Sequence, residues 1–323
     1  MNICIYGAGG IGGYLAARLS IAGFNVSVVA RGQNLDAIKK NGITLLSDNL
    51  KENVRVSASD EIPKEKQQYV LIATKTTALQ EISPYLNFFA SSGATLVPLM
   101  NGIPHWYFFG TNSVFKNSTI KCLDPNGKIS KLIPWTSILG TVVYPACELI
   151  EPGVVRHIYG NRFSIGELSG NKTDRVIEFS KILSESSLRA PIRKDIRTEI
   201  WVKLMGNLAL NSISALTSSS IQDIIDDQET RKLAINLMDE TQNVANSLGI
   251  KLPISIEKRL QGALDVGHHK TSMLQDIENG RNIEIDSIVT AVKEMGVLSK
   301  TPTPTIDIVH SLLAKKASIL SCQ

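Results

Sequence analysis

The feature that most constrains this chain is a glycine-rich turn that follows its first apolar segment. Ile3, Ile5 and Tyr6 belong to a short apolar run typical of a buried strand. The next six residues form a G-x-G-x-x-G turn, followed by an apolar helical pattern: Gly7, Ala8, Gly9, Gly10, Ile11 and Gly12. Glycines also mark ordinary turns, but between a strand and a helix they let a pyrophosphate approach the backbone. The pattern therefore predicts that these six residues bind a dinucleotide.

The end of the second predicted strand indicates which dinucleotide is bound. Sites for NAD or FAD usually place Asp or Glu about 20 residues beyond the first glycines, where it binds the ribose hydroxyls. Residues 24–33 contain no acidic residue, and the strand at residues 25–30 leads into Arg31. An exposed arginine at a strand end is common, but its fork of donors can also bind a 2′-phosphate. We therefore expect NADP(H) as the cofactor, bound in part by Arg31.

Composition excludes several other classes of protein. With 323 residues and 43% hydrophobic content, the chain can form more than one core, so two domains are expected. The net charge of +4 comes without a long basic block and does not indicate nucleic-acid binding. The four cysteines show no C-x-x-C spacing, which argues against a metal site or a disulfide framework. We expect neither a signal peptide nor a membrane span, and therefore a cytoplasmic protein.

Two polar residues follow predicted parallel strands of the amino-terminal half. The apolar runs at residues 69–73 and 95–99 are followed by Lys75 and Asn101. Open α/β sheets bind ligands at the carboxyl ends of their strands, so both side chains are candidates for the cofactor site. Each could equally be a solvated loop residue.

Domain organisation follows from a change in pattern along the chain. Residues 116–136 are polar and rich in turn signals, which predicts an exposed loop or small hairpin. Helical patterns dominate from residue 173 onward. The predicted fold is an α/β Rossmann-type domain over residues 1–168, followed by an all-α domain over residues 169–323.

A second group of polar residues lies in the helical half. Lys203, Asn207 and Asn211 recur every four positions, which places them on one face of a helix. They could simply be exposed, but one cation and two amides could also bind a carboxylate and a carbonyl. Farther along, Ser272 and Glu284 lie on either side of a predicted helix end at Gly280. By position alone, Glu284 is better explained as an acid at a helix N-terminus.

Taken together, these residues resemble the ketopantoate reductase (2-dehydropantoate 2-reductase) family over nearly the whole chain. The residues that carry the resemblance are the glycine turn, Arg31, Lys75, Asn101-Gly102, the run 203–216 and the segments 272–276 and 284–286. The resemblance implies NADPH-dependent reduction of a 2-oxo acid, in a cleft between a Rossmann domain and a helical domain. The reaction it implies is 2-dehydropantoate to pantoate, in pantothenate and coenzyme A biosynthesis.

The resemblance also implies roles for single residues. Lys203 matches the catalytic general acid, and Glu284 matches a catalytic acid that contacts the substrate near it. The residues that match substrate-binding positions are Asn207, Asn211 and Ser272, and those near the nicotinamide are Lys75 and Asn101. The chemistry agrees, because hydride delivery to a ketone builds negative charge on oxygen, which an ammonium group can stabilise and then protonate.

Departures from the family pattern leave the substrate open. His269 stands where many relatives carry Asn, Val289-Thr290 stands where Asn-Gly is common, and residues 116–136 form a longer segment than usual. A paralogous 2-oxo acid reductase, an opine-type dehydrogenase and a non-catalytic NADP-sensing protein therefore remain as alternatives. The sequence does not decide the oligomeric state, for which a homodimer is one option.

Overall fold

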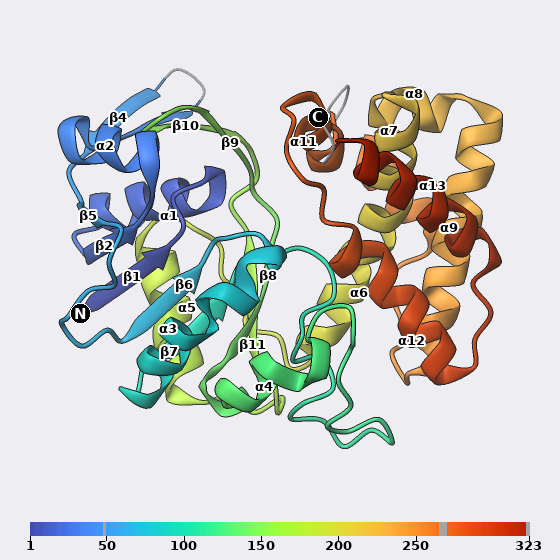
Figure 1. Ribbon diagram of the computed structural model, residues 1–323, viewed down its shortest axis with the longest axis horizontal. Helices are drawn as coiled ribbons and strands as arrows, with labels where there is room; N and C mark the ends of the chain where they lie inside the picture. The colour runs from blue at the N-terminus through green and yellow to red at the C-terminus, as the bar shows by residue number, and fades with distance from the viewer. Residues whose placement is uncertain (48–49, 265–269, 321–323) are drawn as a thin grey trace. The chain divides into compact units, whose positions relative to one another are not determined.

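The computed structural model describes residues 1–47, 50–264 and 270–320 and divides into two compact units (Figure 1). The first unit comprises Met1–Met100, Phe109–Asn112 and Gly127–Ile196, and the second comprises Asn101–Phe108, Ser113–Asn126 and Arg197–Gln323. The helical part of the second unit thus begins about 30 residues beyond the boundary predicted near residue 168. The difference arises because helix α5 (Asp174–Glu185) packs on strand β11 (Phe163–Glu167) and shares the core of the first unit.

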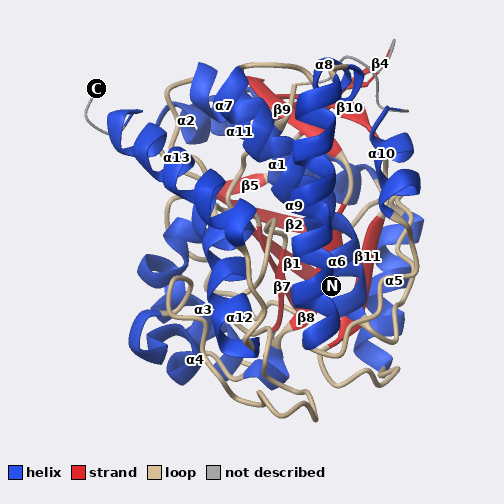
Figure 2. Cartoon of the chain, turned by 90° about the vertical axis from the view of Figure 1, so that its right-hand side faces the viewer, coloured by secondary structure: helices blue, strands red, loops and turns tan. Residues whose placement is uncertain are grey.

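The first unit is built on a five-stranded parallel sheet, which confirms the Rossmann-type prediction. Figure 2 draws the strands of the chain in red and its helices in blue. In spatial order its strands are β5 (Ser57–Ser59), β2 (Asn25–Val29), β1 (Asn2–Tyr6), β6 (Tyr69–Ile72) and β7 (Thr95–Pro98). The helices that follow them are α1 (Gly10–Ile21), α2 (Gly32–Asn41) and α3 (Leu79–Ser91), with the short turn η1 (Thr76–Ala78). All four residues of β6 are buried, as expected for a parallel strand covered on both faces.

The register of this sheet places three of the loops predicted to bind the cofactor side by side. Tyr6 at the end of β1 pairs with Val29 of β2 on one side and with Ile72 of β6 on the other. The carboxyl ends of the three strands therefore lie at one edge. The glycine turn, Arg31 and Lys75 follow these ends directly, so the loops that carry them are neighbours.

A second sheet and a two-stranded ribbon complete the first unit. The sheet has the order β4 (Leu50–Val54), β3 (Ile43–Ser47), β10 (Val154–Tyr159) and β9 (Ala146–Glu151). The ribbon pairs β11 with β8 (Leu139–Val143). Helix α1 packs on β3, β9 and β10, so that its buried Tyr14 and Leu15 join the core with Val155.

Residues 116–136 are neither a hairpin nor fully exposed, so this prediction was wrong. The segment forms η2 (Pro125–Gly127), α4 (Lys128–Leu132) and the start of η3 (Trp135–Ser137). Ile120, Asp124 and Ile129 are buried among its polar residues. The prediction failed because a few buried residues scarcely change the average polarity of a segment.

The second unit is helical, as predicted, and its described residues contain no strand. Its helices are α6 (Ile196–Gly206), η4 (Asn207–Asn211), α7 (Ser212–Thr217), α8 (Ile221–Asp226), α9 (Gln228–Ser247), α10 (Ile256–Leu264), α11 (Ser272–Glu278), η5 (Asp286–Thr290), α12 (Ala291–Ser299) and α13 (Pro304–Leu320). Helix α9 is central, because it packs on η4, α8, α12 and α13. Among the described residues, no helix is long and apolar enough to cross a membrane.

Two short π-helical segments distinguish this unit. Segment η4 interrupts the helix between α6 and α7, η5 precedes α12, and the two segments pack against each other. A π segment has more residues per turn than an α-helix, and such segments are frequent at functional sites. Asn207 and Asn211, predicted to share one helix face with Lys203, lie at the two ends of η4.

Candidate active site

The glycine turn has the backbone geometry of a phosphate-binding loop. Gly7 has φ +104°, and a Cβ there would lie 2.9 Å from the carbonyl oxygen of Ala73. A Cβ at Gly12 would overlap the carbonyl oxygen of Gly7, so α1 approaches the turn as closely as only glycine permits. At Gly9, by contrast, no atom of the described residues beyond its two chain neighbours lies within 4 Å of an added Cβ. The loop is thus tight at Gly7 and Gly12 and open at Gly9, where the N-terminus of α1 offers backbone N–H groups to an anion.

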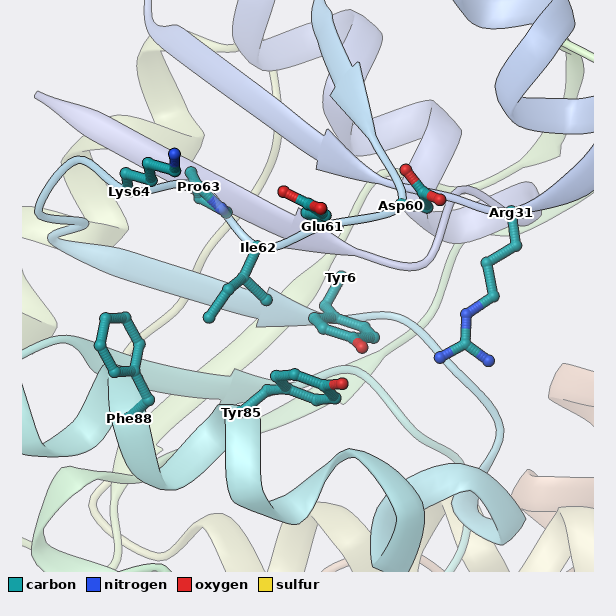
Figure 3. A pocket seen from close by; sticks show the side chains of 9 residues that line it. All are labelled: Tyr6, Arg31, Asp60, Glu61, Ile62, Pro63, Lys64, Tyr85 and Phe88. Atoms are coloured by element: carbon teal, nitrogen blue, oxygen red, sulfur yellow. The ribbon is translucent and has the colours of Figure 1, made fainter.

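Arg31 lies at the N-cap of α2, directly after β2. Its guanidinium donates to Glu81 Oε1 at 3.0 Å, and both side chains are 63% exposed. A cavity of about 390 Å³ adjoins it, with the neighbouring rings of Tyr6 and Tyr85 on one side and Asp60 on another (Figure 3). Because an exposed ion pair is weak, a 2′-phosphate can compete with Glu81 for the arginine.

The two remaining cofactor candidates belong to different units. Lys75 follows β6 and is the N-cap residue of η1 in the first unit. Asn101 follows β7 but belongs to the second unit, where its Oδ1 accepts a hydrogen bond from Lys203 Nζ at 2.5 Å. The adjoining Gly102 has φ +86°, and a Cβ there would overlap the carbonyl of Ser287 in η5. Asn101 is therefore fixed beside the predicted general acid by tight backbone packing.

Lys203 is the centre of a group of polar and charged side chains in the second unit. It is partly buried in the last turn of α6. Burial and the nearby charge of Arg259 lower the pKa of Lys203 from its usual value to about 8, against the opposing effect of the Glu284 carboxylate. A lysine with this pKa is largely protonated at neutral pH and can still release a proton readily.

The predicted substrate residues lie on elements that pack together. Asn207 and Asn211 begin and end η4, and Asn211 is 7% exposed. Ser272 is the exposed first residue of α11, a helix that packs on η4. Gly280, with φ +62°, lies beyond the end of α11 at residue 278, as predicted, and Glu284 lies just before η5. The second unit thus brings the elements that carry these side chains together.

The residues that depart from the family pattern lie in different surroundings, and one of them is not described by the structure. Val289 is buried in η5, and Thr290 Oγ1 donates to Asp286 Oδ1 at 3.0 Å. His269 lies outside the described residues. The described part of the chain holds no group of three or more His, Cys, Asp or Glu side chains arranged to bind a metal ion.

Comparison with known protein families matches both units. The family model "Ketopantoate reductase PanE/ApbA" matches residues 3–170, and "Ketopantoate reductase PanE/ApbA C terminal" matches residues 195–317. The chain belongs to the ketopantoate reductase family. The resemblance inferred from its motifs is therefore confirmed.

Individual relatives agree with this assignment along the full length. A curated 2-dehydropantoate 2-reductase from Mesorhizobium japonicum is 46% identical, covering 100% of this chain and 99% of its own. A crystal structure from Ralstonia solanacearum MolK2 is 33% identical, covers 99% of this chain and 98% of its own, and superposes with a TM-score of 0.93. D-mandelate dehydrogenase, in a structure with NADH and anilino(oxo)acetate, shares the fold at lower identity. It is 21% identical, covers 99% of this chain and 100% of its own, and superposes with a TM-score of 0.86.

Sequence reasoning missed two neighbours of Lys203 in this family member. Arg259 lies on α10, with no motif to mark it, and contributes a second positive charge near Lys203. Gly206 resembles an ordinary helix-interior glycine, yet the guanidinium of Arg259 occupies the space where its side chain would be. A glycine at helical spacing from Lys203 was the one available signal, because glycine costs helix stability unless packing requires it.

Proposed function

We propose that this member of the ketopantoate reductase family reduces 2-dehydropantoate to pantoate with NADPH, in pantothenate and coenzyme A biosynthesis. The observation that carries the proposal is the partly buried ammonium of Lys203, hydrogen-bonded to Asn101 and influenced by Arg259 and Glu284. This arrangement occurs in a chain that matches both family models and a full-length relative of that name. It suits the stabilisation of negative charge on a ketone oxygen.

The first unit fits the cofactor. The open backbone at Gly9 leaves room for a pyrophosphate, and the exposed guanidinium of Arg31 is available to a 2′-phosphate. The residues that would hold NADPH are Gly7, Ala8, Gly9, Gly10, Ile11, Gly12, Arg31 and Lys75. When bound, the cofactor supplies a hydride to C2 of the substrate.

Lys203 then supplies the proton of the reaction. Its ammonium stabilises the negative charge that develops on the keto oxygen and donates a proton to that oxygen. Asn101 accepts a hydrogen bond from Nζ, which orients the ammonium. Glu284 opposes the effect of burial on the pKa of Lys203, so that the acid form persists at neutral pH. We propose that Asn101 serves the acid in this way, in addition to the cofactor role predicted from its position after β7.

The substrate is held by amide and hydroxyl groups in this proposal. Asn207, Asn211 and Ser272 donate hydrogen bonds to the 2-oxo acid, and Glu284 contacts the part of it beyond C2. Hydrogen bonds to a charged group each contribute about 1.5–3 kcal/mol, so a few such donors suffice for orientation. The packing of α11 and η5 on η4 supports the grouping of these residues.

The test is NADPH oxidation by the purified protein, followed with a panel of 2-oxo acids. We expect the highest kcat/KM for 2-dehydropantoate, and lower values for simpler branched 2-oxo acids and phenylglyoxylate. A preference for another acid would establish the paralogous reductase instead. Cofactor binding without turnover of any acid would favour the NADP-sensing alternative.

We also propose a cytoplasmic homodimer. A family relative from Staphylococcus aureus is described as a dimeric ketopantoate reductase, with 21% identity and a TM-score of 0.74. The cysteines at positions 4, 122 and 147 carry free thiols, in keeping with a reducing compartment. Light scattering coupled to size-exclusion chromatography should give twice the monomer mass of 35.2 kDa. A measured mass equal to that of the monomer would contradict the proposal.

A further inference from the structure

The backbone conformation at Gly206, in the second unit, does not require a glycine. It has φ −72° and ψ −42°, ordinary helical values that any residue adopts. It follows Lys203 by three residues, a rise of about 4.5 Å along an α-helix. A Cβ at this position would overlap Nη2, Cζ and Nε of Arg259. The absence of a side chain therefore makes room for a guanidinium group against the helix that carries Lys203.

Arg259 is placed there by a packed element. Helix α10 packs on α8 and α9, and its residues Leu260 and Ala263 are buried. Its neighbours Glu257 and Lys258 are exposed, whereas Arg259 is partly buried. The guanidinium is thus held against the backbone at Gly206 by the position of α10.

Two cations close together suggest an anion as their ligand. Arg259 lies near enough to Lys203 for its charge to lower the pKa of that lysine, so the two charges repel each other, while the Glu284 carboxylate acts on Lys203 in the opposite sense. Like charges near one another cost free energy, and a bound anion lowers this cost further. A 2-oxo acid carries its carboxylate on the carbon next to the keto group, so one molecule can present an oxygen to each cation.

We propose that Arg259 is a substrate-binding residue, which takes the carboxylate of the 2-oxo acid while Lys203 faces the keto oxygen. The planar guanidinium can donate two parallel hydrogen bonds to a carboxylate, which fixes both its position and its plane. Asn207, Asn211 and Ser272 then complete the binding of the same molecule. This inference rests on the proposed function, because it assigns the carboxylate of that substrate.

The first test removes the guanidinium. For Arg259→Gln we expect KM for 2-dehydropantoate to rise roughly 10- to 150-fold, with a smaller change in kcat. Affinity for oxamate, a stable mimic of a 2-oxo acid, should fall by a similar factor in calorimetry. The preference for the acid over its ethyl ester should be lost, because the ester offers no carboxylate. Lys258→Gln, which removes a positive charge from the exposed side of α10, should leave all three quantities unchanged.

The second test moves the guanidinium without removing it. In Gly206→Ala the new methyl group must displace the far end of the Arg259 side chain, which is flexible, while alanine favours the helix. We expect a stable protein with weaker oxamate binding and a higher KM. Gly262→Ala is the matched control, because among the described residues outside its own stretch of helix no atom lies within 4 Å of a Cβ added there.

The outcomes separate this inference from the proposed function. Turnover of 2-oxo acids by the wild-type protein tests the function, whereas oxamate binding tests the role of Arg259 with or without turnover. Wild-type protein that binds no oxamate would overturn the inference. So would an Arg259→Gln protein that binds oxamate as the wild type does and keeps its preference for the acid, even if its melting temperature falls.

Discussion

The two units form their candidate sites in opposite ways. In the first unit, the predicted cofactor residues lie within short loops at the ends of adjacent strands, and the glycine turn is continuous in sequence. In the second unit, Asn101, Lys203, Arg259 and Glu284 come from four separate segments. The first kind of site is encoded by local backbone geometry, and the second by the packing of helices. A substitution should therefore act locally in the first unit and through several partners in the second.

The electrostatics of the two sites also differ. Arg31 and Glu81 form an ion pair at the surface, where solvent weakens the interaction between them. Lys203 is partly buried, so the charges of Arg259 and Glu284 act on it through a medium of lower polarity. We expect charge substitutions around Lys203 to change activity and its pH dependence, and those around Arg31 to change mainly the choice of cofactor.

The largest effect is expected for Lys203→Ala. Loss of the general acid should lower kcat by roughly 10²–10⁴-fold, while NADPH affinity, which depends on the first unit, stays nearly unchanged. Single-turnover kinetics and fluorescence titration with NADPH measure the two quantities. Near wild-type turnover would show that another group supplies the proton.

Arg31→Ala tests the predicted cofactor site of the first unit. NADPH affinity should fall roughly 10- to 150-fold because a charge-assisted bond to the 2′-phosphate is lost, whereas NADH affinity changes little. Titration with both cofactors measures the difference. Equal losses for NADPH and NADH would contradict the predicted role of Arg31.

The pH profile of kcat/KM should report the coupling around Lys203. Because the protonated lysine is the acid, activity should fall as pH rises above about 8, approaching a tenfold loss per pH unit. Glu284→Gln removes a carboxylate that favours the ammonium form, so this alkaline limb should move to lower pH. A limb that does not move would show that Glu284 does not influence the acid.

The smallest effect is expected for Glu81→Gln. The exposed pair with Arg31 is weak, so removing its acid should strengthen NADPH binding no more than about fivefold. The gain should shrink at high salt, because screening already weakens the pair. A large loss of NADPH affinity would instead mean that Glu81 positions Arg31 for the phosphate.

Prediction from sequence was most successful where short-range signals are strong. The strand, glycine turn and helix around Gly9 were found because the spacing of the glycines between an apolar run and a helical pattern is a signal within a short stretch of sequence. The prediction for residues 116–136 failed, since Asp124 and its buried neighbours leave no periodic pattern. The helix through Asn207 was expected, but its change to a π segment at η4 was not, because no simple residue pattern marks where an α-helix becomes a π segment.

The sequence by itself determined the family, the order of the two folds and the position of Lys203 on a helix, because periodicity and spacing are properties of the chain. Only the tertiary structure decided what surrounds that lysine. Asn101 contacts it because Gly102 packs on Ser287, and Arg259 lies near it because α10 brings a guanidinium to the bare backbone at Gly206. Such contacts join residues far apart in the chain, so they are set by how helices pack and by which side chains are small enough to allow it.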